Sequence, residues 1–543
     1  MIPLDAEISG ACALVIDGNN ASRSMLVNLL RDFGVTEVQQ VRRAQEARQV
    51  LDQRRFDIVV CDYHFDGEPV SGQDLIDDLR LAQALPLSTV VVMISAESAH
   101  SKVAEAAEAA LDAYLIKPHT AEALRQRLCE ARARKRALKD VIALIEKAAY
   151  LEAAELCQAR FDTRGRAWVQ AARIGAELWL RLGKPQAAQR LFDAILEIGA
   201  VPWARLGVAR SQHERGSTSQ ARRSLESLLV EQPGYADAYD VMARVLLEQG
   251  LPDEALKASR EALSLTPGSV ARLVKHGLLA FFYGDPREAC TALAHAARFG
   301  LHSKVFDLQG LVLLAFVQFD KGDLRGLTQS WRATTVARNS RMGSDRLRRF
   351  EAVTAVLKCL LERQVTEAVM QARALIREAR DPTFEFEAAC NLLALVSRLM
   401  RHELRLEGVD DDVRVVAQRF AVSHTTCELL VRSLRDDPAL ARIVQDTYDD
   451  ICRQAEEAVS NTLKGQPGEA ARFLLTRAES TLNAKLMDLA IHTIDRHEPH
   501  IEDAAALRER AGALFKRYRS YGTQVKLGCG TGDVRALNQW AKA

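Results

Sequence analysis

Four polar residues each stand directly after a short apolar run of the chain. They are two carboxylates, Asp17 and Asp62, a hydroxyl, Ser95, and an ammonium, Lys117. A carboxylate nucleophile needs a cation and hydrogen-bond donors around the negative charge that develops as it reacts. These four side chains would supply such a set if the fold brought them together.

The runs that precede them predict the elements that would do so. They alternate with stretches of helical spacing, which is typical of a parallel sheet covered by helices on both faces. In such a doubly wound α/β sheet the carboxyl ends of the strands meet at one edge, so the four side chains should converge. Strands are expected at 11–16, 37–41, 56–61, 89–94 and 113–116, and helices at 22–33, 44–52, 72–83, 102–110 and from Thr120, the N-cap, onward.

Three stretches, VVCDYHF, VVVMISA and YLIKP, resemble the receiver domain of two-component response regulators over about residues 10–125. The resemblance implies that Asp62 accepts a phosphoryl group from a histidine kinase or a phosphotransfer protein. It further implies that Ser95 donates to a phosphoryl oxygen, that Lys117 is the cationic partner, and that a cis peptide precedes Pro118. The implied Mg²⁺ site consists of Asp17, Asp62 and His64.

One landmark of that family is changed. Receivers usually carry two adjacent acids after the first strand, whereas here Gly18 follows Asp17 and removes the direct Mg²⁺ ligand. Because Mg²⁺ is commonly held by one or two carboxylates, this loss weakens the site. Substitute ligands would have to come from Asn19, Asn20, Asp66 or Glu68. Two alternatives follow, a receiver that is switched by phosphorylation and a pseudo-receiver that binds partners without switching.

A second periodicity begins where the strand signals end. Glycines at 183, 216, 250 and 284 recur at intervals of 33 or 34 residues, each followed five residues later by alanine. This resembles the tetratricopeptide repeat, in which helix pairs stack into an all-α superhelical solenoid. Weaker echoes lie at Gly322, Arg363 and Gly465. The resemblance implies a groove that binds a protein or peptide through Arg173, Trp203, Arg210, Asp237 and Arg244.

The expected domains are a receiver at 1–120, a basic helical linker at 121–147, repeats at 148–303, degenerate repeat-like helices at 304–520 and a flexible tail at 521–543. The linker should be one helix running from residue 120 to 147. Its seven basic residues could touch nucleic acid, but the chain has no helix-turn-helix or zinc pattern. In the tail, VKLGCGTGD is similar to the glycine-rich motif of methyltransferases, yet only ten residues follow it.

Composition and further motifs narrow the function. The apolar runs are too short to span a membrane, and acidic residues near the N-terminus disfavour a signal peptide, so we expect a cytoplasmic protein. There is no P-loop and no CxxC pair. We expect no enzymatic activity beyond phosphoryl acceptance and autodephosphorylation at Asp62. The leading hypothesis is a phosphorylation-switched adaptor, and the alternatives are a constitutive scaffold and a nucleic-acid-binding regulator.

Overall fold

A computed structural model describes residues 8–65, 71–81, 84–96, 112–199, 201–301, 306–340, 343–402, 404 and 406–518. The chain forms two compact units. The first contains the residues up to His276 together with His295–Asp307, and the second contains Gly277–Ala294 and the helices that follow Leu308.

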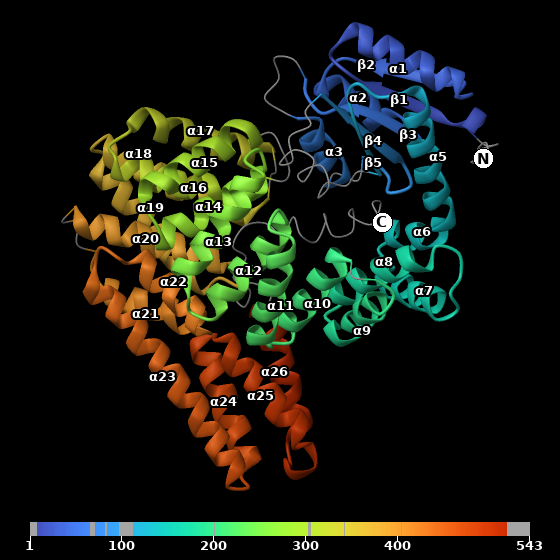
Figure 1. Cartoon of the computed structure of the whole chain (residues 1–543). Coiled ribbons are helices and arrows are strands. Elements are labelled where there is room, and N and C mark those ends of the chain that lie inside the picture. Colours follow the sequence, from blue (N-terminus) through green and yellow to red (C-terminus); the bar gives the residue numbers. More distant parts are fainter. Residues whose placement is uncertain are drawn as a thin grey trace. The chain divides into compact units, whose positions relative to one another are not determined.

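The first unit begins with the expected five-stranded parallel sheet (Figure 1). The strand order is β2-β1-β3-β4-β5, and each of the four strand pairs is parallel. The predicted five-stranded sheet is therefore confirmed. The bounds are β1 Cys12–Ile16, β2 Glu37–Val41, β3 Ile58–Asp62, β4 Val90–Ser95 and β5 Ala113–Ile116.

Helices bury both faces of this sheet, which explains why its central strands are apolar up to the polar residues at their carboxyl ends. On one face, α1 (Asn20–Asp32) and α5 (Ala121–Ala137) pack Leu30 and Leu124 against the strands. On the other, α2 (Ala44–Gln53) and α3 (Gly72–Leu81) pack against the core. Thr120 caps α5 as expected, its hydroxyl accepting from the Ala123 amide. The helix expected at 102–110 lies outside the described residues.

The single helix expected from residue 120 to 147 is instead two helices, α5 and α6 (Lys139–Glu146). The break is at Leu138, whose φ of −110° and ψ of 13° leave the helical region. The two halves are buried in different cores: Leu128 of α5 packs with the strands, whereas Ile142 of α6 packs with the helices that follow. Leu87, in the segment before β4, also packs against this second core.

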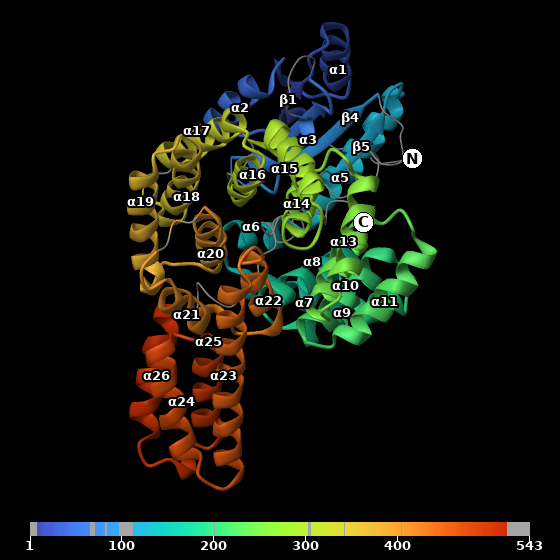
Figure 2. The ribbon, with the colours of Figure 1, turned by 90° about the vertical axis from the view of Figure 1, so that its left-hand side faces the viewer.

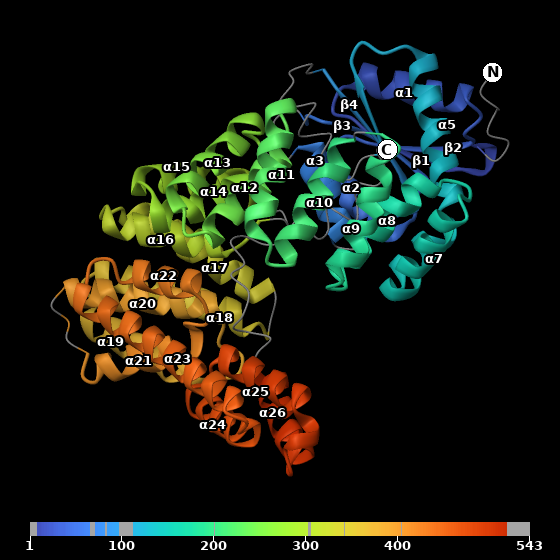
Figure 3. The ribbon, with the colours of Figure 1, turned by 60° about the horizontal axis from the view of Figure 1, so that its bottom comes forward.

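The helices after α6 form antiparallel pairs with the expected 34-residue repeat (Figures 1 and 3). Gly183, Gly216 and Gly250 turn between paired helices with φ of 68°, 77° and 73°, a region that favours glycine. Five residues after each glycine, the expected alanine is fully buried. The bounds are α7 Tyr150–Asp162, α8 Trp168–Arg181, α9 Pro185–Leu196, α10 Pro202–Glu214, α11 Thr218–Glu231, α12 Ala236–Glu248, α13 Pro252–Leu265, α14 Val270–Tyr283 and α15 Pro286–Gly300.

The second unit continues the pairing in a less regular form. Gly322, Arg363 and Gly465 each turn between two helices, with φ of 69°, 62° and 83°. Near the end, α23 to α26 lie side by side (Figures 1 and 2). The bounds are α16 Gln309–Asp320, α17 Leu324–Ser340, α18 Asp345–Leu361, α19 Val365–Arg377, α20 Phe386–Arg401, α21 Val409–Phe420, α22 His424–Ser433, α23 Pro438–Leu463, α24 Pro467–Thr481, α25 Ala484–Arg496 and α26 Ala504–Tyr518.

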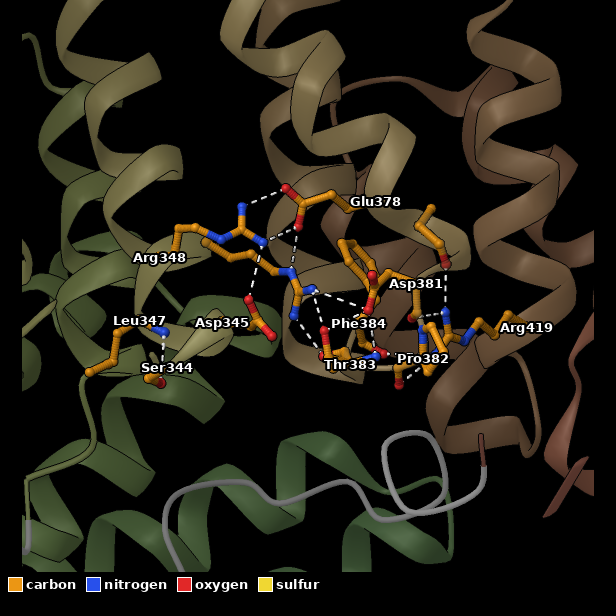
Figure 4. A network of polar contacts seen from close by, with 12 residues as sticks. Ser344, Asp345, Leu347, Arg348, Glu378, Asp381, Pro382, Thr383, Phe384 and Arg419 are labelled. Carbon is orange, nitrogen blue, oxygen red and sulfur yellow. Dashed lines mark hydrogen bonds and ion pairs between the residues drawn. The ribbon is translucent and has the colours of Figure 1, made fainter. Parts of the chain in front are cut away.

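Two buried arginines hold the loop between α19 and α20 in the second unit (Figure 4). Arg349 donates to Glu378 at 2.8 Å and to the Thr383 carbonyl at 2.6 Å. Arg419 donates to main-chain carbonyls of the same loop, including that of Asp381 at 2.8 Å. Both arginines are therefore used inside the fold.

Candidate functional site

The sheet brings the four predicted side chains to one edge. Asp62 and Ser95 are the last residues of β3 and β4, and Asp17 and Lys117 directly follow β1 and β5. The parallel register aligns these strand ends, because Asp62 pairs with Ile94 and Ser95 pairs with Ile116. The peptide before Pro118 is cis, as the resemblance implied.

Lys117 joins the two carboxylates. Its Nζ lies 2.8 Å from Oδ2 of Asp62 and 3.3 Å from Oδ2 of Asp17. The side chain of Asp17 is fully buried, whereas that of Asp62 is 13% exposed. The main-chain amide of Lys117 also donates to the Ser95 carbonyl at 2.7 Å, which fixes β5 beside β4. Of the two carboxylates, Asp62 is therefore the one that an incoming group can reach.

The charges at this edge oppose one another. Burial raises the pKa of Asp62, and the neighbouring charge of Asp17 adds to the rise, while Lys117 lowers it in part. Burial alone would lower the pKa of Lys117, but its hydrogen bond to Asp62 and the charges of both carboxylates raise it overall. One ammonium thus balances two acids in a partly buried site.

The segment after Asp17 is held by local hydrogen bonds that the sequence did not reveal. Asn19 caps α1, its side-chain oxygen accepting from the Ser22 amide at 3.0 Å. The side-chain oxygen of Asn20 accepts from Arg23 at 2.6 Å, and the Ser22 hydroxyl donates to Asp17 at 2.6 Å. Both amide oxygens that could have replaced the missing acid are therefore already bonded. Asp66 and Glu68, the other candidates, lie outside the described residues.

Among the described residues, Asp17 and Asp62 are the carboxylates at this edge that could hold Mg²⁺. Across the part of the chain that the structure describes, no three His, Cys, Asp or Glu side chains gather as a metal cluster. The side chain of His64, the expected third ligand, does not complete such a cluster; it is exposed and its ring contacts that of Tyr63 edge-on. Two carboxylates with water and phosphoryl oxygens fit Mg²⁺, so Asp17 and Asp62 would hold it.

Gly72 is a further site residue that sequence reasoning missed. Its amide donates to the Tyr63 carbonyl at 2.8 Å, where the chain returns to the sheet edge. A Cβ at this position would lie 2.0 Å from the carbonyl oxygen of Asp62 and 2.9 Å from the Cys61 sulfur. One signal in the sequence could have indicated this role: Gly72 ends the loop that follows Asp62, the aspartate at the end of a predicted strand.

The predicted groove residues lie on the first helices of successive pairs, where each contacts a residue of a neighbouring pair. Arg173 of α8 stacks on the Trp203 ring of α10, with 4.8 Å from the guanidinium carbon to the ring centre. Arg210 of α10 donates to both carboxylate oxygens of Glu177 of α8, at 2.7 and 3.0 Å. Neighbouring repeats are thus joined through residues 30 and 33 positions apart.

The same pattern continues along the unit. Asp237 of α12 accepts from Arg272 of α14 at 2.8 Å, and Arg272 also reaches Asp240 at 3.2 Å. Arg244 lies 3.8 Å from Glu214. The predicted groove residues and their neighbours therefore carry charges of both signs.

The basic run of α5 is partly internal. The Nζ of Lys135 lies 3.1 Å from Asp112 and also donates to the Leu87 carbonyl, while Arg134 donates to the Asp112 carbonyl at 2.9 Å. Burial lowers the pKa of Lys135 to about 8, although Asp112 opposes the change. These two cations attach α5 to the sheet and are not available to phosphates of a nucleic acid.

None of the helices within the described ranges is long and apolar enough to cross a membrane.

Comparison with known proteins relates the first part of the chain to a known family. The response regulator receiver domain family matches residues 13–129. Chemotaxis protein CheY-3 of Vibrio cholerae is 34% identical over 115 residues, which are 21% of this chain and 86% of that protein. Chemotaxis protein CheY of Pseudomonas aeruginosa is 31% identical over 115 residues, 21% of this chain and 90% of that protein.

Among solved structures, the thermophilic TPR protein TTC0263 of Thermus thermophilus is similar at 20% identity and a TM-score of 0.27. The match covers 34% of this chain and 99% of that one.

Proposed function

Because the chain belongs to the response regulator receiver family through residues 13–129, we propose that it is a two-component response regulator with a protein-binding output. Phosphoryl transfer to Asp62 switches the receiver, and the tetratricopeptide-like helix pairs bind a partner protein. The observation that carries this proposal is Lys117, which contacts both Asp62 and Asp17 at the carboxyl edge of the sheet.

The arrangement supports a direct transfer. An oxygen of the Asp62 carboxylate forms a bond to phosphorus while the bond from phosphorus to the donor's histidine nitrogen breaks. The departing ring takes up a proton from water, which gives an acyl phosphate and a neutral imidazole. Lys117 is placed to offset the new phosphoryl charge, and Ser95 ends the adjacent strand. Mg²⁺ held by Asp17 and Asp62 would neutralise further charge on the phosphoryl oxygens.

The side chains of the helix pairs support protein binding as the output. Their first helices present stacked and paired side chains such as Arg173 with Trp203 and Arg210 with Glu177. An incoming peptide can replace one member of each of these pairs with a charged group of its own. The positions of the charges along the peptide, and not its net charge, would then decide which peptide binds. We infer that the partner is a protein and that the chain has no enzymatic activity apart from phosphoryl acceptance and autodephosphorylation.

The test is a Mg²⁺ titration of the full-length protein with acetyl phosphate, read by the mass of intact protein. Wild type should gain one phosphoryl group, Asp62→Asn should gain none, and Gly18→Asp should react at lower Mg²⁺ than wild type. Partner capture from the native proteome should then differ between phosphorylated wild type and Asp62→Asn.

A second candidate function, a constitutive scaffold, is favoured by one observation. Gly18 offers no carboxylate, and the side-chain oxygens of Asn19 and Asn20 are bonded within the fold. If wild type stays unmodified while Gly18→Asp reacts, the native receiver is a docking module that does not switch. Failure of both proteins would contradict the phosphorylation proposal outright.

A further inference from the structure

A cysteine, a lysine and a tyrosine come together between α23 and α25, far along the chain from the receiver edge. Lys485 donates from Nζ to Sγ of Cys452 at 3.3 Å. The same Nζ lies 5.7 Å from the ring centre of Tyr448. Tyr448 and Cys452 are four residues apart on α23, so their side chains share a face of that helix.

The backbone around Lys485 is firmly placed. Asn483 is fully buried and caps α25, accepting from the Lys485 amide at 3.0 Å. The side-chain nitrogen of Asn483 donates to the Gln418 carbonyl at 2.6 Å, which anchors this end of α25 to α21. Lys485 therefore stands in the first turn of a capped helix, where the helix dipole adds to its own positive charge.

The contact differs from an ordinary surface ion pair. Within the described ranges Lys485 forms no ion pair with a carboxylate, so the sulfur of Cys452 is its polar partner. Both side chains are half-buried, which leaves the sulfur within reach of a small molecule. An oxidised sulfur at this position would therefore have a primary amine 3.3 Å away.

Four other cysteines lack this combination. Cys157, Cys390 and Cys427 are buried, and burial raises the pKa of each thiol to about 12. Cys12 has a cation at a similar distance, Arg54 at 3.2 Å, but Glu37 lies 3.1 Å from the same sulfur. The hydrogen bond to Glu37 raises the pKa of Cys12, so its cation does not produce a thiolate.

We propose that Cys452 is a site of oxidation by hydrogen peroxide and that the oxidised sulfur is captured by the amine of Lys485, which links α23 covalently to α25.

The chemistry balances in two steps. The Cys452 thiolate attacks one oxygen of hydrogen peroxide and the O–O bond breaks, giving a sulfenic acid and hydroxide. The hydroxide takes a proton from the Lys485 ammonium, which leaves water and a neutral amine. The amine then attacks the sulfenic sulfur, an S–N bond forms, and the sulfenic hydroxyl leaves with a proton from nitrogen as a second water. Sulfur loses two electrons and the peroxide gains them, and a thiol can reduce the sulfenamide back.

The test treats full-length protein with hydrogen peroxide, digests it with trypsin and maps peptides by mass spectrometry. Wild type should give the two peptides of Cys452 and Lys485 joined, lighter by two hydrogens than their sum, with cleavage after residue 485 blocked. Dithiothreitol should release them. Dimedone, which traps sulfenic acids, should label Cys452 about tenfold faster than Cys12 or Cys390, because the pKa of each of those two thiols is raised.

Two variants separate this reaction from its alternatives. Lys485→Arg keeps a cation but removes the amine, so Cys452 should still be labelled by dimedone while the joined peptides disappear. Cys427→Ala should leave the joined peptides unchanged. The proposal is overturned if Cys452 is labelled no faster than Cys390, or if oxidation instead yields a disulfide that Cys427→Ala abolishes. Failure of the phosphorylation experiment has no bearing on this result, because the two sites share no residue.

Discussion

Gly72 lies directly against the main-chain carbonyl of Asp62, so closely that a Cβ at residue 72 would come within 2.0 Å of that oxygen. Backbone cannot yield as the end of a long side chain can, and a methyl group here must push β3 or the returning loop aside. We expect Gly72→Ala to destabilise the protein by about 1–3 kcal/mol and to slow phosphorylation of Asp62. Urea denaturation and acetyl phosphate labelling measure the two effects.

Gly10→Ala is the matched control, because a Cβ at residue 10 would meet nothing within 4 Å. Equal stability of the two variants would show that the end of β3 tolerates the added atom.

Lys117 should stabilise the site chiefly by balancing its acids. Lys117→Gln leaves Asp17 and Asp62 without their shared cation, and we expect a loss of about 1–3 kcal/mol at pH 7, less than for a fully buried pair. Adding Asp62→Asn should recover part of the loss, because one charge then disappears. A double-mutant cycle by urea denaturation measures the coupling, and strictly additive effects would contradict it.

His213 on α10 should make the stability of the first unit depend on pH. Burial, aided by the charge of Arg244, lowers the pKa of His213 from 6.5 to about 4. Between these values the unfolded chain binds a proton that the folded chain does not. The free energy of unfolding should therefore fall as the pH drops from about 6.5 to about 4, by up to about 3 kcal/mol from this residue. Urea denaturation across that range, compared with His213→Gln, should show a flatter profile for the variant; parallel profiles would refute the assignment.

The turn at Arg363 offers a way to stabilise the second unit. Arg363 is exposed and has a φ of 62°, in the region where the equivalent turns use glycine. Arg363→Gly should remove the clash of its Cβ with the backbone and raise stability by about 0.5–1 kcal/mol, whereas Gly216→Ala at φ 77° should lower it by about 1 kcal/mol. The melting temperatures of both variants, compared with that of wild type, measure these effects. A lower melting temperature for Arg363→Gly would contradict the expected stabilisation.

Ala255 tests the repeat register. It is fully buried five residues after Gly250, so Ala255→Leu should overpack the helix pair and cost about 1–3 kcal/mol. Ala294 on α15 is an exposed alanine, and Ala294→Leu should leave the melting temperature nearly unchanged. Equal effects of the two substitutions would count against the register.

The parts of the fold that depend on local pattern were predictable from the sequence. Strand-end residues such as Asp62 and Lys117 meet because parallel strands share an edge, and Gly183 and Gly216 mark turns because few other residues adopt positive φ without strain. The cap at Thr120 follows from the same kind of local rule.

What the sequence could not show depends on contacts between distant segments. The helix breaks at Leu138, between the residues that pack against the sheet and those that pack in the helical core. No glycine or proline at this position indicates the break. The roles of Asn19 and Lys135 could not be predicted either, because they also depend on the folded surroundings of each side chain. Asn19 could serve as a metal ligand or as a helix cap, and Lys135 could face solvent or Asp112, until the chain around them is folded.

Leu87 has a consequence for the order in which the chain is made. It precedes β4, yet the core it contacts is built from residues 138–204. A ribosome releases the receiver strands first, and domains generally fold in that order. The side chain of Leu87 must therefore remain exposed on the newly made receiver until α6 to α9 have left the ribosome. Until then the nascent protein has an exposed apolar side chain, which the next segment of the same chain will bury.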